Sequence, residues 1–355
     1  MYIVAADSVV DGTGDLSATD DARKRLNDKN YRITEYEISS STDGWQTDLP
    51  PHRLRCACAP LVAFNQARQR MAEGEIDAVV IQGREHMKSD FQGRKDERNR
   101  LMKIYGEGKC GILDGYEKLA QAFITHRDIS ADDFRRTSEY IFENHWRVWQ
   151  TQNPNAPRPA DAWFNPVTPL FRGVDCANPS VDYDGCLVIV SDEVLQKTDF
   201  GLKSYSQIAA CDVQQLCPDG PEFVKEIVSY DHMATSFNIA CAEANVDFKS
   251  VFRNNQALLD IYSCYSVVPM GFLMATGFVE NFAGIPAFAE EFPLTITGGL
   301  NLAKAPWNNT TVQTLASMFH ALKSDQAPDI GGVHSIGALG YLQGFTILRE
   351  VPAYQ

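Results

Sequence analysis

The sequence lacks a surplus of basic residues. Its 355 residues include 32 lysines and arginines against 46 aspartates and glutamates, which gives a formal net charge of −14. Because a chain of this charge repels polyanions except at a local basic groove, we expect no general binding to nucleic acid or to an anionic membrane. The hydrophobic content of 44% is ordinary for a globular protein with a sizeable core.

Long apolar runs are also missing. The segment Tyr265–Val279, YSVVPMGFLMATGFV, is apolar over 15 residues, which is short of the roughly 20 that cross a bilayer. It also contains Pro269, so we predict a buried core helix and no membrane partner. The first residues, MYIVAADSVV, enter a strand-like run without the basic and apolar regions of a secretion signal, and we expect a cytoplasmic protein.

Several signatures of metal and cofactor sites are absent. The nine cysteines include no C-x-x-C pair, and Cys56 and Cys58 lie too close together for the usual zinc spacing. The sequence has no Ser-His-Asp spacing, no P-loop and no G-x-G-x-x-G after its first strand. We therefore predict reduced thiols, no metal site and no permanently bound cofactor.

The sequence does contain two alternating runs of strand-like and helix-like segments. Residues 1–83 alternate, and the pattern returns in 167–200 with the strand-like DGCLVIVSDEV. Residues 201–355 repeat this order, with PLTITGG (293–299) expected as a strand. Residues 84–166, which are charged and aromatic, break the rhythm. We predict two packed α/β halves, 1–83 plus 167–200 and 201–355, with 84–166 as an inserted loop domain.

The stretch CACAPLVAF places two thiols, those of Cys56 and Cys58, immediately before a helix. Backbone N–H groups at a helix start can lower the pKa of a thiol and bind an oxyanion, as a nucleophilic cysteine requires. In the alternative interpretation, the cysteines are small residues that pack a strand-to-helix turn. The local sequence leaves both interpretations open.

Three further stretches carry polar residues next to strands or glycines. LLDIYSCYS puts Tyr262 and Cys264 at a strand end, where α/β folds keep their sites, although packed core residues are the alternative. TGGLNLAKAPWNN could bring the Asn308 and Asn309 amides to a carbonyl oxygen, although Asn309 would also serve as a helix cap. His334, in GGVHSIGALG, is either a pocket residue or a structural one.

Taken in order, these stretches resemble the thiolase superfamily, in its sterol-carrier-type, acetyl-CoA acetyltransferase-like branch. The blocks that carry the resemblance are APLVAFNQARQRMAEGEIDAVVIQGREH, FRGVDCANPSVDYDGCLVIVSDE, LLDIYSCYSVVP and TGGLNLAKAPWNNTTVQTL. The resemblance implies a thiolase-like α/β fold, with two packed halves in a five-layered α/β/α/β/α arrangement. It further implies a homodimer, a coenzyme A thioester as substrate, and a place in lipid metabolism. Gly298, Gly299 and Trp307 would contact the coenzyme A thioester.

The sequence departs from the thiolase pattern at each catalytic position. In thiolases proper, a cysteine at the helix start takes the acyl group and a histidine activates it. Here the nucleophile position falls on Ala57, between Cys56 and Cys58, and a one-residue shift would favour Cys58 slightly. Pro306 stands at the histidine position. The oxygen-binding block reads Tyr-Ser-Cys, and the final turn, GALG, has no cysteine.

Without an activating histidine, ordinary thiolysis is not expected, since general-base help is worth roughly 10²–10⁴ in rate. We predict carbon–carbon bond formation or cleavage on an acyl-CoA, of Claisen or retro-aldol type. The alternatives are a catalytically silent acyl-CoA-binding or scaffold subunit, and a thiol-dependent acyltransferase that uses Cys56 or Cys58. The candidate catalytic residues are Cys58, Cys56, Tyr262, Cys264, Asn308, Asn309 and His334.

Two expectations concern partners. Some divergent relatives work with a small zinc-and-OB-fold protein, so such a chain is an expected partner here. An acidic protein that binds coenzyme A needs a local basic patch, for which the candidates are Arg53, Arg55, Lys88 and Arg94.

Overall fold

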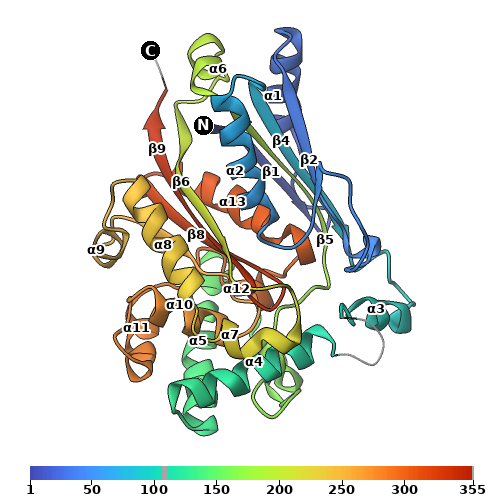
Figure 1. The fold of residues 1–355 in the computed structure, drawn as a ribbon, viewed down its shortest axis with the longest axis vertical. Helices are drawn as coiled ribbons and strands as arrows, with labels where there is room; N and C mark the ends of the chain where they lie inside the picture. Colours follow the sequence, from blue (N-terminus) through green and yellow to red (C-terminus); the bar gives the residue numbers. More distant parts are fainter. Residues whose placement is uncertain (106–109, 354–355) are drawn as a thin grey trace.

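The computed structural model describes residues 1–105 and 110–353. They form one mixed sheet whose two halves enclose two helices, and further helices cover the outer faces (Figure 1). The strands of the first half are β1 (Tyr2–Val10), β2 (Ile33–Ile38), β3 (Arg53–Leu54), β4 (Ala78–His86) and β5 (Asp182–Val190). Those of the second half are β6 (Ser204–Gln215), β7 (Leu258–Asp260), β8 (Ile330–Gly337) and β9 (Leu342–Pro352). Their order across the sheet is β3-β2-β4-β5-β1-β6-β9-β8-β7.

The two halves repeat one pairing pattern outward from the joint between β1 and β6. In the first half, the successive pairs β1–β5, β5–β4 and β4–β2 are antiparallel, antiparallel and parallel. In the second half, the successive pairs β6–β9, β9–β8 and β8–β7 have the same orientations in the same order. At the joint, Tyr2 pairs with Gln207 and Ile3 with Ser206, so the halves share one continuous sheet. The two halves, which were predicted to repeat the same order of strands and helices, therefore also share the same pattern of strand pairing.

Two helices fill the space between the halves. Helix α2 (Ala59–Ala72) contacts β2 and β4 of the first half and β6 and β9 of the second, while α13 (Thr310–Leu322) contacts β1, β5, β7 and β8. Helix α1 (Ser17–Asp28) covers β1 and β5 on the outside, and α8 (Asp231–Glu243) covers β6 and β9. These layers run α/β/α/β/α, which confirms the predicted fold class.

The sequence of α2 explains its central place. Pro60 stands in the first turn, where a missing backbone N–H costs nothing. Ala59, Ala63 and Ala67 recur every four residues, so they share one face and let neighbouring backbones approach closely. Together with Leu61 they are fully buried. A helix this enclosed holds the residues that precede it in a fixed place.

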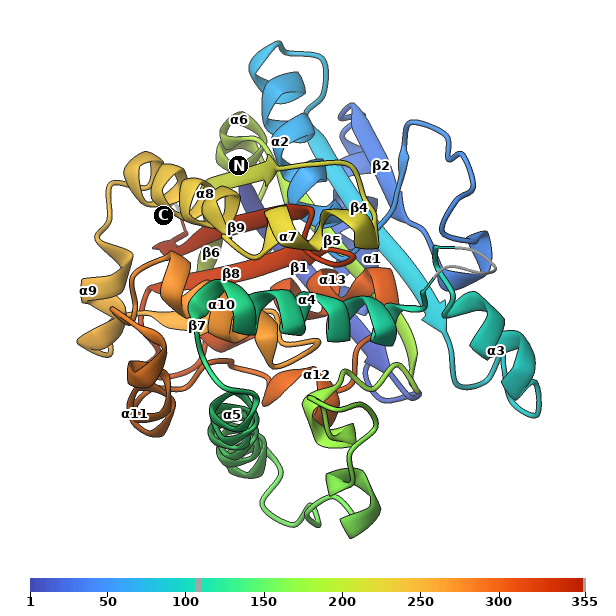
Figure 2. The same ribbon diagram turned by 60° about the horizontal axis from the view of Figure 1, so that its bottom comes forward.

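In its described residues, the chain between β4 and β5 contains three α-helices of its own. They are α3 (Lys95–Leu101), α4 (Ile112–Arg127) and α5 (Ala131–Gln152). Helix α4 packs on α7 (Val224–Ile227) and α10 (Val267–Ala275), and α5 packs on α11 (Ile285–Glu291) and α12 (Gly299–Leu302) (Figure 2). The predicted insertion 84–166 covers these helices, although its first three residues lie in β4; its status as a separate domain stays a prediction.

The remaining short helices are α6 (Asp192–Lys197) and α9 (Phe248–Arg253). The apolar segment Tyr265–Val279 forms α10, whose residues Val267–Leu273 are buried as expected. In the described ranges, no helix has the length and apolarity that a bilayer crossing requires.

Residues 293–298 do not form the predicted strand. Side chains accept the hydrogen bonds that a neighbouring strand would have accepted: Leu294 N donates to Asn144 Oδ1 at 3.0 Å, and Ile296 N donates to Asp260 Oδ2 at 2.9 Å. The Asn144 amide also donates to the carbonyls of Ala289 and Phe292, at 2.6 and 2.7 Å. One buried asparagine on α5 thus holds the segment that leads to the second-half loops.

We therefore expect the Asn144→Ala variant to lose about 3 kcal/mol of unfolding free energy, because the Phe292 carbonyl and the Leu294 N–H lose this partner and the Ala289 carbonyl keeps only Arg147. Urea denaturation followed by circular dichroism measures the loss. Thr151→Ala, on the exposed part of the same helix, serves as the control and should change stability by less than about 0.5 kcal/mol. Equal stability of the two variants would show that this segment is held by other contacts.

Candidate functional site

An apolar cavity of about 80 Å³ lies at the start of α2, where both halves of the molecule and α4 meet. Residues from several separate parts of the chain form its wall. They are Trp45, Ala57, Met102, Ile104, Ile112, Tyr116, Ala177, Pro179, Tyr262, Cys264, Tyr265, Ala305, Trp307, Asn308, Thr310 and Ala338. A concave, mostly apolar site with a few polar groups is typical of small-molecule binding.

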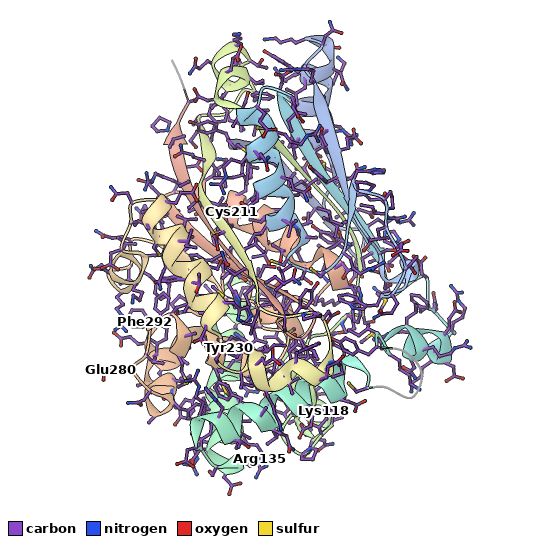
Figure 3. All side chains as sticks on the ribbon, viewed as in Figure 1. Lys118, Arg135, Cys211, Tyr230, Glu280 and Phe292 are labelled. Carbon is purple, nitrogen blue, oxygen red and sulfur yellow. The ribbon has the colours of Figure 1, made fainter. Side chains whose placement is uncertain are left out.

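Ala57 faces this cavity, and its two cysteine neighbours do not line it. Cys56 has a φ of 81°, so the chain turns sharply before α2 and successive side chains diverge. The sulfur of Cys58 packs on the sheet, because a Cβ placed on Gly344 would lie 2.9 Å from it. Cys211 of β6, which is labelled in Figure 3, is also buried and lies near Cys58.

Neither cysteine is poised to act as a nucleophile. Burial raises the pKa of Cys56 to about 12 and raises the pKa of Cys58 well above its usual value. The thiolate is the reactive form of cysteine, so both thiols are inert at neutral pH. The assignment of Cys56 or Cys58 as the nucleophile stays a prediction, but their positions and protonation oppose it.

Tyr262 and Cys264 both reach the cavity, from the segment that follows β7. Burial raises the pKa of Tyr262 well above its usual range and that of Cys264 to about 12. Both groups therefore keep their protons at neutral pH. They can donate hydrogen bonds into the cavity, but they cannot take up a proton as anions.

The two neighbouring asparagines differ in their surroundings. Asn308 lines the cavity beside Trp307, and its amide nitrogen donates to the backbone and side-chain oxygens of Ser39, at 3.0 and 3.1 Å. Asn309 is fully buried away from the cavity, and its amide has no hydrogen-bond partner among the described residues. A Cβ on Gly83 would lie 1.6 Å from the Asn309 oxygen, so this amide packs directly on the β4 backbone.

The structure does not bring His334, Gly298 and Gly299 to the cavity wall. The His334 Nε2 atom lies 2.7 Å from Gln343 Oε1, and burial lowers the pKa of this histidine to about 3. The two glycines have φ values of 88° and 82° and pack against Trp149 and His145 of α5. Their assigned roles stay predictions that this geometry does not support.

Sequence reasoning missed the contribution of α4. Tyr116 stacks on Tyr265 with ring centroids 4.0 Å apart, and its hydroxyl donates to the Ala338 carbonyl in the turn between β8 and β9. Tyr116 thereby joins three parts of the cavity wall. The sequence gives no signal for this role, because only the packing of α4 on the second half brings the tyrosine to the site.

A second, smaller hollow of about 10 Å³ adjoins the cavity and shares Trp45, Ile104, Trp307 and Asn308 with it. Its remaining wall consists of Ser40, Ser41, Gly44, Arg55 and Leu101.

Glu85, a buried residue of β4, fixes the position of Ser41 in the wall of this hollow. Its carboxylate accepts hydrogen bonds from the Ser41 backbone nitrogen at 2.8 Å and from the Ser41 hydroxyl at 2.7 Å. Burial raises the pKa of Glu85 to about 7. The folded protein therefore holds this proton more tightly than the unfolded chain does.

This pKa shift predicts that stability falls as pH rises between about 4.5 and about 7, the unfolded and folded values for Glu85. Relative to the native protein, Glu85→Gln should gain about 2 kcal/mol more at pH 8 than at pH 5, because the neutral amide carries no charge into the interior. Urea denaturation at both pH values measures this. Glu280→Gln, at the surface (Figure 3), is the control. A Glu85→Gln effect independent of pH would contradict the assignment.

Comparison with protein-family models and with curated protein sequences finds no match. Solved structures do match over nearly the whole chain. The monomeric SCP2-thiolase-like protein type 1 of Mycobacterium smegmatis aligns with a TM-score of 0.66 and 17% identity, over 98% of this chain and 76% of that one. The Ltp2-ChsH2(DUF35) aldolase aligns with a TM-score of 0.69 and 13% identity, over 98% and 97%.

A third structure, the Acat5 thiolase from Ascaris suum in complex with coenzyme A, aligns with a TM-score of 0.61 and 13% identity, over 99% of each chain. The arrangement of layers, the repeated strand pairing and these alignments agree with the resemblance read from the sequence. The chain has the thiolase fold, of the kind seen in sterol-carrier-type thiolases.

Proposed function

We propose that the protein binds a coenzyme A thioester and makes or breaks a carbon–carbon bond next to the thioester carbonyl, without a covalent cysteine intermediate. The observation that carries this proposal is Ala57, a methyl group at the cavity wall where a thiolase nucleophile would stand. The likeness to a thiolase bound to coenzyme A and to an aldolase supports the choice of ligand and reaction class.

The chemistry of the cavity suits an enolate. Claisen condensation and retro-aldol cleavage both pass through a thioester enolate, in which negative charge develops on the former carbonyl oxygen. Hydrogen-bond donors fixed in an apolar site stabilise such a charge strongly. Tyr262 lines the cavity and its hydroxyl, which lies beside Thr310, is protonated, so we assign it the role of donor to that oxygen.

The cavity offers donors but no base. In retro-aldol cleavage, the β-hydroxyl loses its proton, the Cα–Cβ bond breaks to leave a carbonyl compound, and the enolate takes a proton at Cα. Among the described residues of the wall, none is a carboxylate or a histidine. This supports the proposal that a small zinc-and-OB-fold chain completes the site, as a second chain accompanies Ltp2 in its complex.

Basic residues near the cavity mouth would meet the coenzyme's phosphates. Helix α3 and its flanks precede the wall residues Met102 and Ile104, and α3 stands out from the body of the molecule (Figure 1). This segment is rich in cations in an otherwise acidic chain: Lys95, Arg98, Arg100 and Lys103 follow Arg94, which pairs with Glu97. We propose that it covers the pantetheine arm together with the rest of residues 84–166.

The alternative function is a silent acyl-CoA-binding or scaffold subunit. The observation that favours it is the same lack of a base and of a reactive thiol in the described cavity wall. For either function we propose a cytoplasmic homodimer. Its contact would use the sheet edge at β3, a two-residue strand that pairs only with β2 in the described part of the chain.

We expect Tyr262→Phe to lower turnover of an acyl-CoA substrate by about 10²–10³, since one donor to a developing oxyanion is worth that much. Its affinity for the thioester should change less than about threefold. Turnover is measured by mass spectrometry of products from a panel of acyl-CoAs, and affinity by calorimetry.

Two controls define the outcome. Tyr140→Phe, a matched change at a half-buried position of α5 that does not line the cavity, and the double variant Cys56→Ala, Cys58→Ala should both keep turnover. Unchanged turnover in Tyr262→Phe would remove this tyrosine from the mechanism. Tight binding without turnover in the native protein, with and without a partner chain, would establish the silent subunit instead.

A further inference from the structure

The small hollow beside the cavity has a more polar wall than the cavity itself. It is formed by Ser40, Ser41, Arg55 and Asn308, among apolar neighbours. Its volume of about 10 Å³ matches the smallest space that holds one water-sized group. A single oxygen of a bound molecule fits there while the rest of the molecule occupies the cavity next to it.

Arg55 is the cation in this wall, and it carries no carboxylate partner. Three other basic residues that the sequence suggested for ligand binding are neutralised within the protein. Arg53 pairs with Glu37 and Asp43, Lys88 with Asp11, and Arg94 with Glu97. No carboxylate of the described residues lies within 4.0 Å of the Arg55 guanidinium.

The guanidinium also has hydrogen-bonding capacity to spare. Its Nη2 atom donates to the Thr47 carbonyl at 2.6 Å, which holds the side chain in place. Its Nε atom is buried and has no partner among the described residues. A buried donor left without a partner is costly, and a charged one more so, so an anionic oxygen bound here would recover that cost.

Three other donor residues around the hollow, Ser41, Asn308 and Trp45, are already committed. The nitrogen and hydroxyl of Ser41 donate to Glu85, and the Asn308 amide donates to Ser39. The Trp45 indole donates to Asp219 at 2.6 Å. Arg55 is therefore the cation in this wall that is free to recognise an anionic ligand.

We propose that Arg55 binds an anionic oxygen group of the thioester, and that this group is a carboxylate on the acyl chain. This inference rests on the proposed function and names its substrate class, an acyl thioester that carries a carboxylate. The acyl chain is the favoured source, because the hollow shares four wall residues with the apolar cavity, where the proposed function places the acyl group. A coenzyme phosphate has the same chemistry and is the second source.

Calorimetry with matched pairs of ligands tests the proposal. Glutaryl-CoA and valeryl-CoA have acyl chains of equal length and differ in a terminal carboxylate or methyl group, as do adipoyl-CoA and hexanoyl-CoA. The corresponding pantetheine thioesters lack the nucleotide phosphates. The variants are Arg55→Gln, which removes the charge, and Arg55→Lys, which keeps it. Arg25→Gln makes the same charge change on an exposed side chain of α1.

If the acyl carboxylate binds Arg55, the native protein prefers the carboxylated ligand of at least one pair about tenfold, in CoA and pantetheine form alike. Arg55→Gln abolishes that preference, Arg55→Lys keeps part of it, and Arg25→Gln leaves it intact. If a phosphate binds instead, Arg55→Gln weakens both CoA thioesters of a pair about tenfold and leaves the pantetheine thioesters unchanged.

Thermal unfolding curves first establish that both Arg55 variants are folded. The inference is overturned if both then bind every ligand within twofold of the native protein. That result leaves the proposed function standing, because the native protein would still bind CoA thioesters. If the native protein binds none of the thioesters, the proposed function itself fails, and the assignment of Arg55 fails with it.

Discussion

The enclosure of α2 between the two halves of the sheet fixes the chemistry of the site. The helix touches strands of both halves as well as α13, and its alanine face leaves no room for adjustment. Moving the chain by one residue would rotate the helix by about 100° and drive larger side chains into the sheet. Ala57 is therefore held at the cavity, while Cys56 and Cys58 are held inside the protein.

Most of the fold could be predicted because strand and helix patterns alternate in the same order in both halves. The segment 293–298 could not be. Its apolar alternation is typical of a strand, but its amides bond to Asn144 and Asp260, which come from distant parts of the chain. A local pattern carries no information about such partners, and the side chains decide the outcome.

A position at the cavity wall was predictable where loops follow strands or precede helices, as for Tyr262, Cys264, Trp307 and Asn308. It was not predictable where the direction of a side chain decides. His334 lies on β8, where neighbouring residues point to opposite faces, and its ring packs on Phe272 in the second-half core, with centroids 4.7 Å apart. The charge environment of Arg55 likewise depends on which acids the fold places beside its neighbours.

The most direct test of the account is disulfide exchange between CoA disulfide and the Ala57→Cys variant, read by intact mass and peptide mapping. If the thiol end of the coenzyme reaches this wall of the cavity, the new thiolate attacks the disulfide, releases one CoA thiol and retains one CoA at position 57. The native protein, whose Cys56 and Cys58 are buried and protonated, stays unmodified at both positions. CoA attached to Cys56 or Cys58 of the native protein, or no adduct in the variant, would contradict the account.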